Sequence, residues 1–146
     1  MWFSSDSLRV KHSKCRSYMK ILLSNFPHCS DFSNDSFLGI LNESCIWDKN
    51  KYWELDKEIY DLSREFAGKD IPRDVSWPMT RIFSFLMMSI QAHYNEHDGF
   101  EITNLDELAV SDWRERLQLV VEGFFRDKMP NNTDFELVNP LLEKSA

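Results

Sequence analysis

The sequence predicts a mainly α-helical fold, a single-domain irregular helical bundle built around one central apolar helix at about residues 75–97. The stretch from Ile82 to Ala92 carries no charge and places apolar side chains in nearly every direction, which is typical of a buried helix. Further amphipathic helical patterns precede and follow this stretch. Glycine and proline are scarce, with four and five residues among 146, so long irregular loops are not expected. One helical domain over 1–146 is therefore predicted, with 1–6 and 143–146 fraying at its ends.

Two helices are predicted in the first part of the chain. The first, Ser7–Ser24, has one apolar face and a mostly basic opposite face. It ends ahead of Pro27, because the residue before a proline disfavours the α conformation. Its basic face is either a solvated surface or a place for a polyanion. The second helix is short, Ser36–Asn42, and Asp35 is its predicted N-cap.

The segment Lys51–Ala67 predicts a clearly amphipathic helix, with Asn50 as its cap and Gly68 as its end. Its apolar stripe consists of Tyr52, Leu55, Ile59, Leu62 and Phe66. Its outer face is charged and includes Glu54, Glu58, Asp61 and Glu65. Trp53 lies off the apolar stripe, and it is therefore predicted to be exposed.

The central helix follows a linker that contains Pro72. Ser76 is its predicted cap, and Pro78 is tolerated in a first turn because its missing N–H would be unpaired there. Gly99 is the predicted end. The residues predicted to be buried are Ile82, Phe83, Leu86, Met87 and Ile90. The free protein is expected to be a monomer.

Two short elements are predicted after the central helix. Phe100–Thr103 alternates between apolar and polar residues as a strand does. Asn104 with Glu107 resembles a capping box for a single helical turn, Leu105–Ala109.

A last long helix is predicted from Asp112, which forms a capping-box pattern with Glu115, to about Arg126. Its apolar stripe consists of Trp113, Leu117, Val120, Val121 and Phe124. Thr133 with Glu136 predicts one more short helix ahead of the C-terminal residues.

Charge is distributed unevenly along the chain, whose net charge is −7. Residues 1–30 carry five basic residues and one acidic residue, whereas residues 31–146 carry twelve basic and twenty-three acidic residues, a net charge of −11. An acidic body repels phosphate backbones, so direct nucleic-acid binding through it is not expected. The same charge attracts a basic partner.

The three cysteines, Cys15, Cys29 and Cys45, are odd in number and match no metal-ligand spacing. The N-terminus lacks the apolar run of a signal peptide. Free thiols in a reducing cytoplasm are therefore expected. No membrane association is expected, because the longest uncharged stretch falls short of the roughly 20 apolar residues that span a bilayer.

One motif has a pattern that is known in catalysis. His93-Tyr94-Asn95-Glu96-His97 matches an inverted zinc-protease motif, in which two histidines four residues apart bind one metal and the glutamate acts as a base. The motif needs a third protein ligand in a larger domain, and it sits at the predicted end of a helix, where histidine is favoured by the helix dipole anyway. No catalytic residue, metal or cofactor is therefore assigned, and no enzyme is predicted. A zinc hydrolase using His93, Glu96 and His97 stays open as an alternative, as does a small cytosolic adaptor.

Several phrases of the sequence are familiar in combination. They are Asn25-Phe26-Pro27, Ser36-Phe37-Leu38-Gly39-Ile40-Leu41, Tyr52-Trp53-Glu54-Leu55, Trp77-Pro78, residues 117–125, Met129-Pro130-Asn131 and Val138-Asn139-Pro140-Leu141-Leu142. Their order and spacing resemble a family of bacterial immunity proteins from contact-dependent growth inhibition and related polymorphic-toxin systems. The resemblance covers about residues 20–142 and contains no catalytic signature.

The resemblance implies a partner and a mode of action. Such proteins stay in the cytoplasm and bind the C-terminal toxin domain of a matching effector. Many of these toxins are basic nucleases, often acting on tRNA, and the immunity protein covers the active site or a binding surface without turnover. The sign of the charge then suggests which residues bind a basic toxin domain. They are Glu54, Glu58, Asp61 and Glu65 on one helix, Asp106, Glu107, Asp112 and Glu115 further on, and Trp53 as an apolar anchor.

Overall fold

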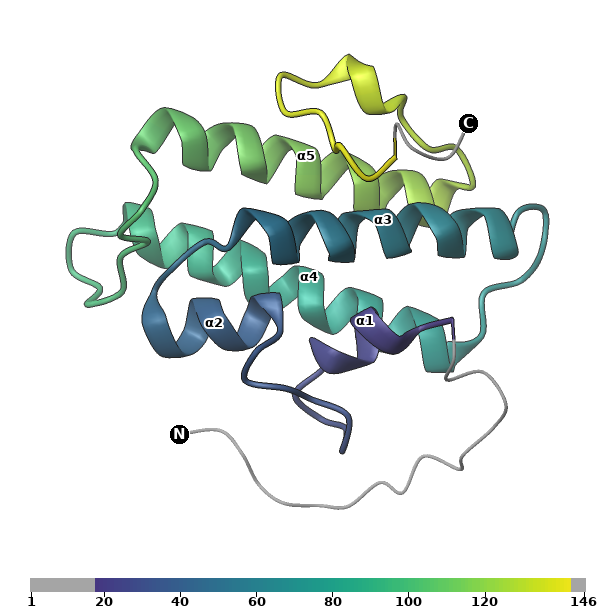
Figure 1. The fold of residues 1–146 in the computed structure, drawn as a ribbon, viewed down its shortest axis with the longest axis horizontal. Coiled ribbons are helices and arrows are strands. Elements are labelled where there is room, and N and C mark those ends of the chain that lie inside the picture. Colours follow the sequence, from purple (N-terminus) through teal and green to yellow (C-terminus); the bar gives the residue numbers. More distant parts are fainter. Residues whose placement is uncertain (1–17, 143–146) are drawn as a thin grey trace.

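The computed structural model describes residues 18–142, and within that range the chain is helical, with no strand (Figure 1). The predicted all-α class is confirmed. The helices are α1 (Lys20–Ser24), α2 (Phe37–Ser44), α3 (Lys49–Glu65), α4 (Arg73–Tyr94) and α5 (Glu107–Arg126), followed by a short 3-10 turn, η2 (Asn132–Asp134). Most of the predicted first helix, and the ends predicted to fray, lie outside the described residues.

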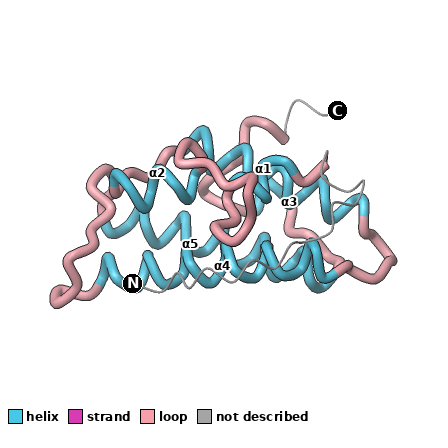
Figure 2. The backbone as a smooth tube through the Cα atoms, turned by 90° about the horizontal axis from the view of Figure 1, so that it is seen from below, coloured by secondary structure: helices cyan, strands magenta, loops and turns pink. Residues whose placement is uncertain are grey.

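The helices form two layers. α4 packs beside α5, and the pair runs along the lower side of the molecule in Figure 2. α3 packs on α5 from the other side, with α1 and α2 next to it. α1 contacts both α3 and α4, so this short helix closes one side of the core.

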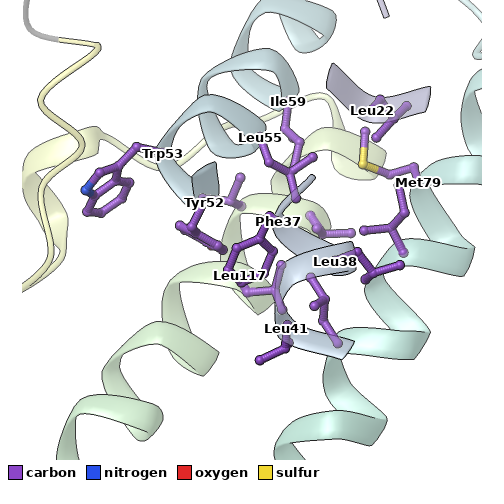
Figure 3. Close-up of a cluster of buried hydrophobic side chains, with 14 of the residues drawn as sticks. Leu22, Phe37, Leu38, Leu41, Tyr52, Trp53, Leu55, Ile59, Met79 and Leu117 are labelled. Carbon is purple, nitrogen blue, oxygen red and sulfur yellow. The ribbon is translucent and has the colours of Figure 1, made fainter. Parts of the chain in front are cut away.

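The core lies between the layers, where the apolar stripes of α3 and α5 meet (Figure 3). Both predicted stripes are confirmed, except that Phe66 is only partly buried. An aromatic cluster joins α2, α3 and α5 at its centre. In it, Trp47 lies 4.8 Å from Phe37 and 5.6 Å from Trp113, measured between ring centroids. Burying rings of this size is a large part of what drives the helices together.

The helices begin at different residues from those predicted, because side chains near the predicted caps reach the free N–H groups better. The Ser36 hydroxyl accepts from Gly39 N at 3.1 Å, so Ser36 rather than Asp35 caps α2. Asp48 caps α3 in place of Asn50, accepting from Lys51 N at 3.0 Å. α2 therefore starts one residue later than predicted, at Phe37, and α3 starts two residues earlier, at Lys49.

α5 is one continuous helix that begins at Glu107, and the carboxylate of its N-cap, Asp106, accepts from Ala109 N at 2.8 Å. The predicted break at Asp112 is wrong, since the whole segment packs as one apolar face. Asn104 is not a cap either. Its side chain binds both Trp47 N and Trp47 O, and so ties the start of α5 to the start of α3.

The segment predicted as a strand, Phe100–Thr103, is an extended connection without a paired neighbour strand. Ile102 is buried, and its N–H donates to His93 Nδ1 at 3.0 Å. Thr103 N donates to Cys45 O at 3.0 Å. The connection is therefore fixed at both α4 and the end of α2.

α4 starts at Arg73 and ends at Tyr94, so Ser76 lies inside the helix and Gly99 lies well beyond its end. Ile82, Leu86 and Ile90 are buried as predicted. Phe83 and Met87 are only partly buried, which corrects the prediction for both. Among the described residues, no element covers the side of α4 and α5 that faces away from α3. Within residues 18–142, the central helix α4 therefore has apolar side chains on a face that no other element covers.

Candidate functional site

The acidic face predicted on α3 is largely neutralised by its surroundings. The Glu58 carboxylate accepts hydrogen bonds from Ile21 N, at 3.1 Å, and from Leu22 N, so it holds α1 rather than facing solvent. Burial raises the pKa of Glu58, and the two N–H donors offset part of that rise. Asp61 pairs with Lys57 at 2.6 Å and also with Arg64. The prediction that Glu58 is free to meet a partner is therefore wrong.

The other two acids of this face, Glu54 and Glu65, are exposed. Glu54 lines a hollow of about 430 Å³ together with Lys20 and Lys51. Asp31 and Asp35 line the same hollow, so three acids and two bases surround it and its acidic character is weak. Glu65 follows Arg64 at the end of the helix. α3 thus presents an acidic surface interrupted by bases.

Trp53 is buried, with 9% of its surface exposed, which corrects the prediction of an exposed anchor. Its ring lies 4.7 Å from that of Trp113, measured between centroids, at the edge of the cluster that is next to the C-terminal segment (Figure 3). The Arg116 guanidinium lies 5.0 Å from the centre of the Trp53 ring. The residues that cover Trp53 come from α5 and from the chain after it, which the apolar stripe of α3 alone does not reveal.

Arg116 is the centre of a buried polar network that sequence reasoning missed. Its guanidinium binds both oxygens of Asp56, and it also donates to Leu137 O at 2.8 Å and Asn132 Oδ1 at 2.9 Å. Asn139 donates to Asp56 Oδ2 at 2.8 Å. Nothing titratable here is exposed, so the network holds the C-terminal segment in place and offers no reactive group to a substrate.

The second predicted set of acids lies in a different setting. Between Ile82 and Trp113 the chain contains no lysine or arginine and six carboxylates, namely Glu96, Asp98, Glu101, Asp106, Glu107 and Asp112. All except Asp112, which is half-buried, are exposed. None of the ion pairs within residues 18–142 involves them. We call the connection from Asn95 to Glu107 and the helix ends beside it the acidic end of the bundle, at the left of Figure 1.

The acidic end is fixed in shape by hydrogen bonds from its neighbours. The Tyr94 hydroxyl donates to Glu107 O at 2.8 Å, which joins the last turn of α4 to the first turn of α5. The contacts of Ile102 and Thr103 described above hold the middle of the connection. Negative charge is thus presented on a fixed backbone, which lowers the entropic cost of binding a partner.

Apolar side chains stand among these carboxylates. Leu108, with 74% of its surface exposed, follows Glu107 directly, and Ile46 and Tyr94 are exposed nearby. Large apolar groups surrounded by charge are a common composition for a protein–protein interface.

The model of one protein family, immunity protein 41, matches residues 24–136, which is more than half of the chain. The chain belongs to the immunity protein 41 family. The matched range contains α2 to α5, the acidic end and the buried Arg116. Membership of this family confirms the resemblance to polymorphic-toxin immunity proteins. Comparison with curated proteins finds no match, and neither does comparison with solved structures.

The geometry of this immunity protein 41 member does not assemble a zinc site from His93, Glu96 and His97. α4 ends at Tyr94, so His93 and His97 do not share a helix face. His93 Nδ1 already accepts from Ile102 N, and His97 lies in the turn beyond the helix. Within residues 18–142 no group of three or more histidine, cysteine or acidic side chains is placed to hold a metal ion. None of the helices in that range is both long and apolar enough to cross a membrane.

Proposed function

We propose that this immunity protein 41 member neutralises a cognate toxin domain of a contact-dependent growth inhibition effector by binding it stoichiometrically in the cytoplasm. Family membership supplies the immunity role. The partner is proposed to be basic, as a nuclease that acts on tRNA would be, because such a domain fits the sign of the charge. Inhibition then consists of covering the toxin's active site or a binding surface, with no reaction carried out by the immunity protein itself.

The observation that carries the choice of surface is the run of unpaired carboxylates at the acidic end. On α3, by contrast, Glu58 holds α1 and Asp61 pairs with Lys57 and Arg64, which leaves only Glu54 and Glu65 exposed. We therefore propose that Asp106, Glu107, Asp112 and Glu115 belong to the toxin interface, together with Glu101 and the exposed Leu108. The acids Glu54, Glu58, Asp61 and Glu65 are then outside it.

The carboxylates and the apolar side chain of this surface are expected to affect different rate constants of toxin binding. Carboxylates at the rim attract a basic toxin over a distance of about 8 Å at physiological salt, and so they raise the association rate. Leu108 supplies apolar area that loses water only in the complex, and so it lowers the dissociation rate.

The test is a matched pair of charge reversals, assayed for binding to the toxin domain encoded beside the immunity gene. Glu101→Lys with Glu107→Lys is expected to slow association about tenfold or more at low salt, with the difference shrinking as salt rises. Glu54→Lys with Glu65→Lys changes the net charge by the same amount on α3 and is the control. Thermal unfolding of both variants shows whether the fold is intact.

The reverse ranking, with the α3 pair slowing association and the acidic-end pair having no effect, would place the interface on α3. If wild-type protein neither binds the neighbouring toxin domain nor protects cells that express it, the immunity proposal for that toxin is wrong.

A further inference from the structure

The open side of α4 and α5 carries a shallow groove that the toxin proposal does not use. It consists of two hollows of about 550 Å³ and 310 Å³ that lie between the two helices. Phe83 lines both hollows and so marks the middle of the groove. Arg114 lines one hollow, and Glu122 lines the other. Together the two hollows form a groove along the α4–α5 layer, and this layer is on the lower side of Figure 2.

The groove is mostly apolar and differs in charge from the rest of the molecule. Its most open large side chains are Met88, with 58% of its surface exposed, Tyr94, with 45%, and Phe125, with 43%. Methionine adapts its shape to a partner surface more readily than branched side chains do. The two hollows together are lined by two arginines and one carboxylate, whereas residues 31–146 as a whole carry nearly twice as many acids as bases. The lining of the groove therefore carries no excess of negative charge, so it adds little to the repulsion between two acidic molecules.

The charged side chains of α5 beside the groove are complementary to those of a second α5 that runs in the opposite direction. Arg114 Nη1 donates to Gln118 Oε1 at 3.3 Å, and Gln118 Nε2 donates to Glu122 Oε1 at 3.2 Å. Positive, neutral and negative groups therefore follow one another along α5 at intervals of four residues. A second α5 packed antiparallel, with its Gln118 opposite the first, places each Arg114 against the other copy's Glu122. This is the self-complementary pattern of a two-fold interface.

The size of the face is sufficient for a specific contact. α4 has 22 residues and α5 has 20, so each is about 30 Å long at 1.5 Å per residue. Two helices of about 10 Å diameter side by side present about 600 Å² per copy, or about 1,200 Å² in total, which is at the lower end of specific protein interfaces.

We propose that two copies of this protein associate face to face through the α4–α5 groove, with a two-fold axis near Gln118. A monomer was expected because the central helix was predicted to be buried on all sides. One side of this helix is instead accessible to solvent, because Phe83 and Met87 are only partly buried and Met88 is exposed. Because both copies are acidic elsewhere, salt is expected to strengthen this dimer. Salt acts on the toxin complex in the opposite direction, so the two associations are distinguishable.

The test measures the mass of the free protein, without toxin, by sedimentation across a concentration series at low and high salt. Wild type is expected to dimerise more tightly at high salt. Met88→Asp is expected to weaken the dimer about tenfold or more, because it puts an unpaired charge into the contact. Ile46→Asp is the matched control, since Ile46 is also an exposed apolar residue but lies between α2 and α3, away from the α4–α5 layer, and lines neither hollow. It is expected to leave the dimer intact.

A charge exchange tests the axis itself. Arg114→Glu alone and Glu122→Arg alone each place like charges opposite each other and are expected to weaken the dimer, whereas the double exchange restores the pairs and the affinity. The proposal is overturned if the wild type stays monomeric at every concentration and salt, or if Met88→Asp and Ile46→Asp dimerise equally. Loss of toxin binding in Met88→Asp from a monomeric parent would also overturn it, since the groove would then belong to the toxin.

Discussion

The guanidinium of Arg116 on α5 and the carboxylate of Asp56 on α3 form a two-pronged ion pair from which solvent is fully excluded. Arg116 Nε lies 2.9 Å from Asp56 Oδ1, and Nη2 lies 2.7 Å from Oδ2. Two parallel hydrogen bonds of this kind fix the guanidinium in plane and orientation. A buried charge pair adds little net stability compared with apolar residues, but either partner alone is costly.

The first prediction removes one partner. Arg116→Met is expected to lower the free energy of unfolding by about 3–5 kcal/mol, because Asp56 is left charged and buried while Asn132 and Leu137 lose a donor. Denaturant unfolding measures this. Arg114→Met, on the same helix but only half-buried, is the control and is expected to cost well under half as much. An equal loss of unfolding free energy in the two variants would show that the buried Asp56–Arg116 pair does not stabilise the fold more than an ordinary surface arginine does.

A second prediction concerns Gly39, where two backbones touch. A Cβ added there would lie 2.6 Å from Ser33 O and 2.7 Å from Asn34 Cα, which is inside contact distance of main-chain atoms that cannot move aside easily. Gly39→Ala is therefore expected to destabilise the protein by about 1–3 kcal/mol, despite the helix preference for alanine. Gly99→Ala is the control, since nothing lies within 4 Å of its added Cβ. The melting temperature should fall in the first variant and stay nearly constant in the second.

The third prediction concerns stability at alkaline pH. Burial raises the pKa of Tyr60 to about 12, and the Tyr60 hydroxyl donates to Pro130 O at 2.9 Å. The unfolded chain releases this proton near pH 10, whereas the folded chain keeps it until about pH 12. Between these values the folded state binds more protons, so stability falls as pH rises, by up to about 1.4 kcal/mol per pH unit for each such group.

The measurement is the unfolding free energy of wild type and Tyr60→Phe from pH 8 upward. Tyr60→Phe is expected to be less stable near neutral pH, through loss of the hydrogen bond to Pro130, but to lose less stability per pH unit above about pH 10. Tyr52 is also deeply buried with a raised pKa, so some alkaline loss remains in the variant. Parallel curves for the two proteins would contradict the assignment to Tyr60.

Periodicity was sufficient to predict the helices because each long helix buries one face. The stripes of α3 and α5 are regular and were identified correctly, whereas the helix starts depend on which nearby side chain reaches an N–H group. Asp48 and Asn50 both have suitable side chains, and only packing selects Asp48. The break predicted at Asp112 arose in the same way, from a cap pattern inside a continuous helix.

The candidate site was harder to predict because exposure depends on residues distant in sequence. Trp53 lies off its stripe, and no local pattern shows that Arg116 and the C-terminal segment cover it. An apolar stretch of sequence also does not show whether every side of the helix it forms is packed against other elements. Phe83 was expected to be as buried as Leu86, yet it faces the open groove, so its truncation to alanine is expected to cost less than that of Leu86.

The network around Arg116 makes the segment after α5 a structural part of the bundle. Asp56 and Arg116 lie on α3 and α5, but Asn132, Leu137 and Asn139, which complete their hydrogen bonds, all lie beyond α5. A chain cut just after α5 would leave the buried guanidinium without part of its partners and Trp53 without part of its cover. Such a truncation is expected to destabilise helices that keep every residue of their own.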